Sequence, residues 1–333
     1  MLLPYIAKRI LILIPLLFMI SIISFILIQL PPGDFLNMYI MQLRASGTTI
    51  HEEQIAQLKF LYGLDKTLPE QYLIWMKNIL FHGNFGNSFQ YNRPVADILL
   101  ARIPLTAAVS IATTIFIWLV AVPIGIYSAT HQYSLVDYFW TFISFIGVAV
   151  PSFLLALIFI WIAFVVFDIS AIGLFSPQFE NAPWSFAKVV DLLKHIWVPV
   201  VIIGMSGTAG LMRTMRGMML DELNKQYVIT ARAKGLSELR LLVKYPVRTA
   251  MNPVISTIGW MLPAIVGGEV LVSMVLNIPT IGPVLFTALM NQDMYLAGSI
   301  VFILSVLTVV GTLISDILLV WLDPRIRYEE VAQ

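Results

Sequence analysis

Long stretches without acidic or basic residues dominate the sequence. Six of them are predicted to cross a membrane as helices, at residues 10–30, 103–130, 138–167, 196–212, 249–268 and 294–315. A helix needs about 20 apolar residues to span the hydrocarbon core of a bilayer, so the fourth stretch has a marginal length. The pattern predicts an all-α integral membrane protein with six transmembrane helices. Prolines such as Pro123, Pro151 and Pro263 within these stretches are expected to kink the helices.

The composition agrees with this prediction and excludes other classes of protein. Hydrophobic residues make up 59% of the chain and charged residues only 12%, with a mean hydropathy of +0.87, whereas a soluble protein has about 25% charged residues. A net charge of +1 gives no overall field that would favour nucleic acid. The chain has no cysteine, and its four histidines lack metal-ligand spacing on one helix, so we predict no metal site and no cofactor bound by this chain.

Basic residues in short loops predict the orientation of the chain. They precede the first apolar stretch, follow the sixth, and concentrate between the fourth and fifth, where residues 213–248 hold eight basic and three acidic side chains. Because such residues are enriched in cytoplasmic loops, both termini and residues 213–248 are predicted to be cytoplasmic. Residues 31–102 then lie on the outer side of the plasma (inner) membrane. The predicted division is an anchor helix at 1–30, an outer helical region at 31–102, a five-helix core at 103–322 and a cytoplasmic tail at 323–333.

The outer region has two signals for the start of a helix. Thr49-x-x-Glu52 and Thr67-x-x-Glu70 both have the capping-box pattern, and Gly83 is expected to end the second helix. The second helix places five apolar side chains on one face, namely Tyr72, Trp75, Met76, Ile79 and Leu80. These amphipathic helices either cap the helix bundle or form a docking surface for an external partner.

The basic segment is predicted to contain a short helix near residues 227–235. Gly235 is expected to end it, and Ser237 to cap a following helix. The small side chains of Ala231 and Ala233 would let another surface approach closely. A short helix held between two membrane spans can transmit motion between a soluble partner and the bundle.

Several motifs in a fixed order resemble a known family. Residues 227–238 read Tyr-x-x-Thr-Ala-Arg-Ala-Lys-Gly-Leu-Ser-Glu, which is similar to the cytoplasmic loop of permease subunits in binding-protein-dependent ABC importers, most closely the peptide, nickel and oligosaccharide branch. The remaining motifs of this resemblance extend over nearly the whole chain and are Pro32-Gly-Asp34, Tyr62-Gly-Leu-Asp65, Gln71-Tyr-x-x-Trp75, Gly83-Asn-Phe-Gly-Asn-Ser88, Arg93-Pro-Val95, Arg102-Ile-Pro-Leu-Thr106, Arg248-Thr-Ala-Met-Asn-Pro253, Asn277-Ile-Pro279 with Gly282, and Asp323-Pro-Arg325.

The resemblance implies a division of labour among subunits. This chain and a second, homologous permease would form the pathway as a heterodimer in the lipid bilayer, two cytoplasmic ATPase subunits would bind ATP and magnesium, and an extracytoplasmic solute-binding protein would deliver the substrate. The segment 229–236 would be the coupling helix that enters a cleft of the ATPase. By that match the coupling residues are Tyr227, Thr230, Ala231, Arg232, Ala233, Lys234, Gly235 and Leu236.

Two of these residues, Arg232 and Lys234, are candidates for ion pairs with acidic groups of the ATPase. Exposed ion pairs stabilise little, so apolar packing of Ala231, Ala233 and Leu236 is expected to matter more. The sequence also departs from the family pattern: Ile229-Thr230-Ala231 replaces the usual Glu-Ala-Ala start of the loop motif, the usual Leu-Pro end falls near Val247-Arg248, and Thr280 and Pro283 stand where Gly and Arg are common.

The sequence contains no phosphate-binding loop of the type Gly-x-x-x-x-Gly-Lys-Ser/Thr. We therefore predict that this chain is not an enzyme and that the assembled complex hydrolyses ATP. Alternating access would move the substrate, with peptide as the first choice and oligosaccharide as the alternative, while the solute-binding protein selects it.

Two other classes of membrane protein have features that occur in this sequence. Gly204-x-Ser206-Gly207 is similar to the motif of intramembrane serine proteases, but no histidine follows it to act as a base. Gly204, Gly207 and Gly210 are instead predicted to allow close helix packing. An ion-coupled secondary transporter needs ionisable groups in the membrane, for which Glu269 and Asp316 are the candidates. We interpret both as possible polar points of the pathway or of a contact between subunits.

Overall fold

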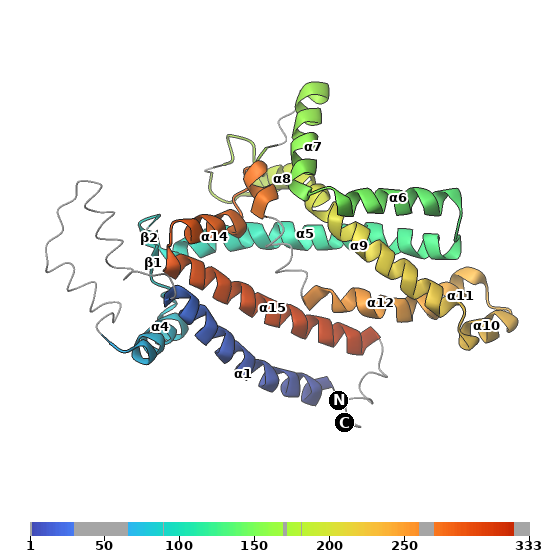
Figure 1. The fold of residues 1–333 in the computed structure, drawn as a ribbon, viewed down its shortest axis with the longest axis horizontal. Coiled ribbons are helices and arrows are strands. Elements are labelled where there is room, and N and C mark those ends of the chain that lie inside the picture. The colour runs from blue at the N-terminus through green and yellow to red at the C-terminus, as the bar shows by residue number, and fades with distance from the viewer. Residues whose placement is uncertain are drawn as a thin grey trace. The chain divides into compact units, whose positions relative to one another are not determined.

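The computed structural model describes residues 2–29, 66–88, 90–168, 172–180, 182–259 and 270–322. Over these ranges the chain is mostly helical (Figure 1), as the apolar stretches predicted. It forms two compact units. We call Leu105–Thr280, with the first seven residues and the segment from Leu307 onward, the core unit, and Lys8–Pro104 with Ile281–Val306 the N-terminal unit.

The core unit consists of helices, most of which follow one another with short connections, whereas a longer loop joins α7 to α8. They are the part of α5 (Val95–Thr130) from Leu105 onward, α6 (Leu135–Ala149), α7 (Ser152–Phe167), α8 (Phe186–His195), α9 (Trp197–Leu223), α10 (Gln226–Ala233), α11 (Glu238–Lys244), α12 (Pro246–Ser256) and the end of α15 (Met294–Leu322).

The described part of the chain contains three helices that are long and apolar enough to cross a membrane: α5, α9 and α15. The predicted third span is not one straight helix, because α6 and α7 meet at 105°. Pro151 explains the break, since it has no N–H to continue the helix and Val150 before it is extended. Counting the bent pair as one span gives up to four.

Two predicted spans extend beyond what this count tests. α1 (Leu2–Gln29) contains a shorter apolar stretch at Leu11–Leu27. The fifth apolar stretch begins in α12, whereas residues 260–269 lie outside the described ranges. The total of six spans therefore remains a prediction.

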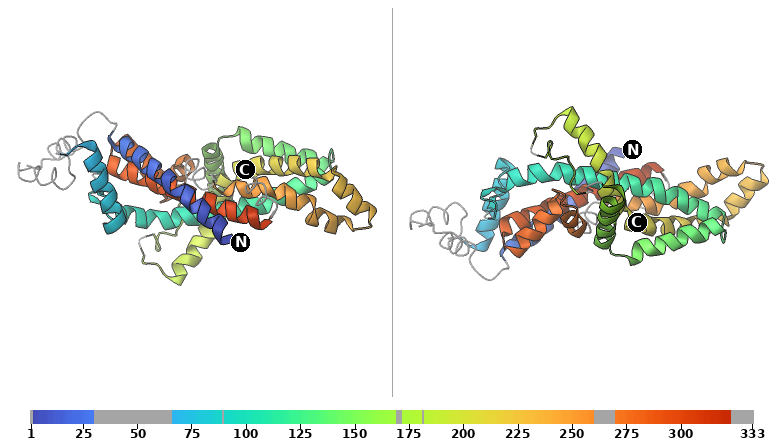
Figure 2. Two further views of the ribbon diagram at one scale, coloured as in Figure 1. Left: turned by 90° about the horizontal axis from the view of Figure 1, so that it is seen from below. Right: turned by 90° about the horizontal axis from the view of Figure 1, so that it is seen from above.

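Helix α9 lies at the centre of the core unit, with α6, α7 and α12 packed against it (Figures 1 and 2). Near its start, Val198 and Ile202 share a cluster with residues of α5 and α7. Near its end, Met215 and Met219 share another with residues of α5 and α12. The same helix thus holds together both ends of the unit.

Glycines permit part of this close packing. A Cβ atom on Gly204 or Gly207 would lie 2.6 Å from the side chain of Phe116 or Ile117 on α5, so the prediction of close packing is confirmed for both. The prediction is wrong for Gly210, where a Cβ would meet no atom of the described residues within 4 Å. Gly125 on α5 is equally confined, because its Cβ would lie 2.8 Å from Met215 Cβ.

The N-terminal unit contains α1 from Lys8 onward, α4 (Leu68–His82), the antiparallel strands β1 (Asn87–Ser88) and β2 (Arg93–Pro94), α14 (Ile281–Met290) and the start of α15. The predicted capping box of α4 is present, since the Thr67 N–H donates to the Glu70 carboxylate at 3.0 Å. This bond lowers the pKa of Glu70. Gly83 ends the helix in a left-handed conformation, as predicted. The other predicted capping box, at Thr49, lies outside the described ranges.

One face of α4 is buried, and it carries four of the five predicted side chains. Trp75 and Ile79 are buried, and Tyr72 packs edge-on against Phe25 of α1. Leu80 is exposed, so its assignment to this face was wrong.

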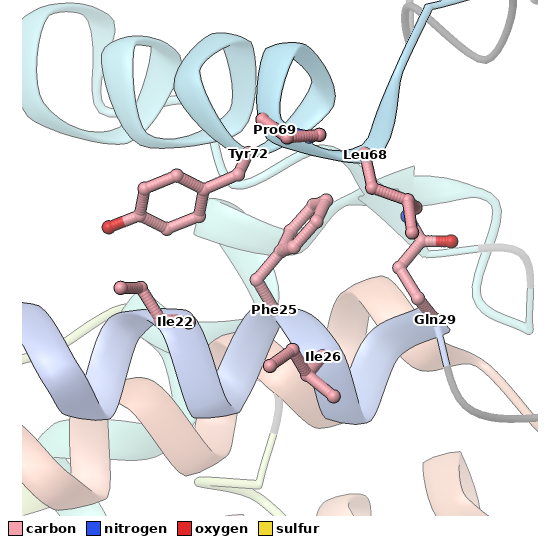
Figure 3. A pocket seen from close by; sticks show the side chains of 7 residues that line it. All are labelled: Ile22, Phe25, Ile26, Gln29, Leu68, Pro69 and Tyr72. Atoms are coloured by element: carbon pink, nitrogen blue, oxygen red, sulfur yellow. The ribbon is translucent and has the colours of Figure 1, made fainter.

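A pocket of about 470 Å³ opens between α1 and α4 (Figure 3) and is lined by Ile22, Phe25, Ile26, Gln29, Leu68, Pro69 and Tyr72.

A buried carboxylate ties the hairpin of the N-terminal unit to helix α15. Asp293 accepts hydrogen bonds from the Ser88 hydroxyl and the Gln90 N–H, and its other oxygen accepts the Leu296 N–H in the first turn of α15. The Asp293 side chain therefore caps α15 and fixes the position of the hairpin at the same time.

Gly125 and Gly210 form a matched pair for testing the helix packing of the core unit. Gly125→Ala forces its methyl group against Met215 and the Met212 carbonyl oxygen, 3.0 Å away, and overpacking of this kind costs about 1–3 kcal/mol. Gly210→Ala is expected to be neutral or to stabilise by up to about 1 kcal/mol, because alanine favours a helix and the space is open. Thermal unfolding in detergent, followed by tryptophan fluorescence, measures both. Equal stabilities would contradict the packing.

Candidate coupling site

The basic segment of the core unit folds as α9, α10, α11 and α12 in succession. Helix α10 ends as predicted at Gly235, whose φ of 77° is left-handed and therefore suits glycine. The Gly235 N–H donates to Arg232 O at 3.0 Å, and the Leu236 N–H donates to Ala231 O at 3.4 Å. These two bonds form a Schellman motif, which satisfies carbonyls at the helix end. Ser237 occupies the N-cap position of α11, as predicted, but its side chain makes no capping bond.

Helix α10 has an inner face that packs within its own chain. Val228 and Ala231 are buried together with Leu241 of α11. Leu236 and Tyr245 cover this small cluster from the connecting segments. The two short helices thus form one folded hairpin rather than a loose loop.

The opposite face of α10 is exposed. Residues three, four and seven positions apart share one face of a helix, so Gln226, Ile229, Thr230 and Ala233 lie together on this outward face. The Thr230 hydroxyl donates to Gln226 O at 2.8 Å, which uses its hydrogen in the helix itself. These four side chains are uncharged, and the small Ala233 lets another surface approach closely.

The outward face differs from the predicted set of coupling residues in two ways. The structure separates the two alanines, since Ala233 faces outward while Ala231 is buried against Leu241. Ile229 is exposed beside Ala233 but was absent from the predicted set. The family motif gives no role to Ile229. Its spacing of four residues from Ala233 places both on one face of a helix, and this signal in the sequence could have identified Ile229.

The Arg232 guanidinium forms an ion pair with a carboxylate of its own chain, that of Glu238. Its Nε donates to Glu238 Oε1 at 2.6 Å and its Nη2 donates to Oε2 at 3.2 Å, across the Gly235 turn. The hydrogen bond from Arg232 holds the pKa of the Glu238 carboxyl below its ordinary value. The Tyr227 hydroxyl likewise donates to the Glu222 carboxylate at the end of α9. Lys234 is exposed at the end of α10.

An ion pair that the sequence did not reveal joins α9 to α6. Arg216 donates from Nε and Nη2 to the two carboxylate oxygens of Asp137 at 3.0 and 2.9 Å. Asp137 is buried and also accepts the Tyr133 N–H at 3.0 Å. Arg216 lies two turns before the end of α9, so this fork anchors the helix that leads into α10.

The two predicted pathway residues are placed differently. Asp316 lies half-buried on α15, next to Ser315, whose hydroxyl donates to Ile255 O of α12 at 2.9 Å. Glu269 lies outside the described residues.

The apolar helices are long enough to cross a membrane, which fits an integral membrane protein of the permease class. Comparison with known sequences is consistent with this class: residues 121–328 match the family described as binding-protein-dependent transport system inner membrane component, and residues 2–110 match the N-terminal region of such membrane components. The chain belongs to this family of ABC importer permeases, in its peptide and nickel branch.

Individual relatives align over nearly their full length. The oligopeptide transport system permease protein AppB of Bacillus subtilis is 35% identical over 97% of this chain and 99% of its own. The dipeptide transport system permease protein DppB of Lactococcus lactis is 30% identical over 97% and 99%. The peptidoglycan transport system permease protein YejB of Agrobacterium fabrum is 30% identical over 98% of both chains.

The ion pair between α6 and α9 can be tested by removing one partner. Arg216→Met leaves the Asp137 carboxylate buried without its cation, and a loss of this kind costs about 3–5 kcal/mol. The reversed pair Asp137→Arg with Arg216→Asp is expected to regain part of that stability. Arg213→Met is the control, because Arg213 lies on the same helix with its side chain exposed. Thermal unfolding in detergent measures all variants, and a control as unstable as Arg216→Met would argue against the ion pair.

Proposed function

We propose that this chain is the permease subunit of an ATP-driven importer for peptides, and that it forms half of the translocation pathway. The observation that supports this most is full-length similarity to relatives whose names specify oligopeptide and dipeptide transport. A second permease related to this one forms the other half, and a solute-binding protein on the outer side selects the cargo. Substrate passes by alternating access between the two halves.

We further propose that the outward face of α10 docks onto a separate ATPase subunit, which carries the ATP and magnesium. Ile229 and Ala233 supply an apolar contact, and Tyr227 and Thr230 border it. Ala231, Leu236 and the Arg232–Glu238 pair act within the hairpin, where they keep α10 rigid. Gly235 permits the sharp turn. Lys234 is the other basic residue among the predicted coupling residues. It is exposed at the end of α10, where we propose that it meets the ATPase.

A displacement of α10 would be transmitted to the candidate membrane span α9, to which it is directly connected, and from there to α6. Helix α9 connects to α10 through a short turn at Asn224 and Lys225, and the bond between Tyr227 and Glu222 spans this turn. The Asp137–Arg216 pair passes the displacement of α9 on to α6. In this proposal the basic segment and both termini lie in the cytoplasm, because basic residues are enriched in cytoplasmic loops.

Uptake of a labelled oligopeptide tests the proposed transport. Cells that lack this chain are expected to lose ATP-dependent uptake, and expression of the chain restores it. Collapse of the proton gradient at constant ATP leaves the rate nearly unchanged, because the energy comes from the ATPase. Uptake that follows the proton gradient and ignores ATP would support an ion-coupled transporter instead, with Asp316 and Glu269 as its ionisable groups.

A charge on the outward face of α10 tests the docking surface. Ala233→Asp is expected to prevent co-purification of the ATPase, because a carboxylate would be buried without a partner in an apolar contact. Gln132→Asp is the control, since it adds the same charge at an exposed position of another loop on the predicted cytoplasmic side.

Mass spectrometry of the proteins that elute with each variant measures the outcome. Retention of the ATPase by Ala233→Asp at the level of the unmodified chain would place the contact elsewhere. Loss of the ATPase in both variants would indicate a general effect of added charge.

A further inference from the structure

Helix α8 is amphipathic with its faces reversed from those of a helix in a water-soluble protein. Its side that packs against the chain carries Leu192 together with two charged residues, Lys188 and Asp191, which are only 6% and 7% exposed. Its free side carries Phe186 and Leu193, which are 85% and 64% exposed. In a helix bordered by water the charged side chains would lie outside and the apolar ones inside.

Specific bonds fix this orientation. Asp191 accepts hydrogen bonds from the Ser176 N–H and hydroxyl, both at 2.7 Å. The Lys188 ammonium donates to the carbonyl oxygens of Ala182 at 2.6 Å and Glu180 at 3.3 Å.

Aromatic rings of the preceding loop enclose the same ammonium group. The Lys188 Nζ atom lies 4.8 Å from the ring centroid of Phe175 and 5.4 Å from that of Trp184. These contacts with the loop prevent α8 from rotating about its axis to hide Phe186 and Leu193. The apolar face is therefore held outward by the structure and is not a consequence of loose attachment.

The position of α8 in the chain indicates what covers this face. Only Ile196 separates α8 from Trp197, where the candidate membrane span α9 begins. A helix at the end of a span lies at the level of the lipid head groups. Trp184 and Trp197 flank α8 with exposed rings, as is typical of aromatic residues at a membrane surface. Lys194 is exposed at the side of the apolar face, within reach of lipid phosphates.

We propose that α8 lies in the membrane interface with Phe186, Val189, Val190 and Leu193 inserted among the upper acyl chains of the bilayer. Helices of this type bury their apolar face about 5–10 Å into the boundary between head groups and acyl chains. The inserted helix holds the start of α9 at a fixed depth. This proposal requires a membrane protein but does not depend on the cargo or on the ATPase, so it stands or falls separately from the proposed function.

The absence of cysteine makes a direct test available, because one introduced cysteine is the only thiol of this chain. Phe186→Cys and Leu193→Cys are each labelled with the fluorophore NBD in the full chain, together with any subunits that co-purify, and reconstituted in vesicles of phosphatidylethanolamine and phosphatidylglycerol. The unmodified, cysteine-free chain prepared in the same way is the blank for label on a co-purifying subunit. Leu239→Cys on α11 is the control, because that residue is 76% exposed and lies in the basic segment. Lipids brominated near the head group and aqueous iodide are the two quenchers.

Labels at both α8 positions are expected to emit at shorter wavelength than the control and to be quenched several-fold more by bromolipid. Iodide is expected to quench the control several-fold more than the α8 labels. Quenching of the α8 labels by iodide to the extent of the control would show that the face meets water and would overturn the proposal. Protection of the α8 labels from both quenchers would show that protein covers the face, and would also overturn it.

Discussion

A polar group inside a membrane protein has little water available, so it must find its partner within the chain or in another subunit. Buried charged side chains in the described part of the core unit meet this constraint. Asp137 is paired with Arg216, and Lys188 is surrounded by carbonyl oxygens and aromatic rings. In the N-terminal unit Asp293 accepts hydrogen bonds from a hairpin and from a helix start. The Asp137–Arg216 and Asp293–Ser88 contacts join residues far apart in the sequence, whereas the Lys188 contacts fix α8 against the loop that precedes it.

Features with a local cause could be predicted from the sequence. Apolar runs of sufficient length indicated the candidate spans α5, α9 and α15, because a helix satisfies its own backbone. Thr67 and Glu70 are three residues apart, so the capping box needs no tertiary contact. Gly235 ends α10 for a similar reason, since its backbone conformation suits glycine wherever it occurs.

Features that depend on distant residues could not be predicted. Asp137 and Arg216 are 79 positions apart, and nothing in either neighbourhood specifies the other. The position of Ala231 inside the hairpin depends on Leu241, which approaches only after the chain turns. The reversed faces of α8 likewise require the preceding loop to fold against Asp191. The motif resemblance identified the segment that folds as α10 and the turn after it, but which side of α10 faces outward is decided by packing.

The length of α9 has a mechanical consequence. Its 27 residues form one unbroken helix, and at 1.5 Å per residue it measures about 40 Å, roughly 10 Å more than the hydrocarbon thickness of a bilayer. A rod of this length that tilts by about 10° around one end moves its other end by roughly 7 Å, which exceeds the pitch of a helix. A small tilt of α9 around its end at α8 thus corresponds to a large displacement of its end at α10. A small tilt around the α10 end likewise displaces the α8 end. Arg216 makes α6 part of the same lever, because the fork to Asp137 does not let the two helices slide past each other freely.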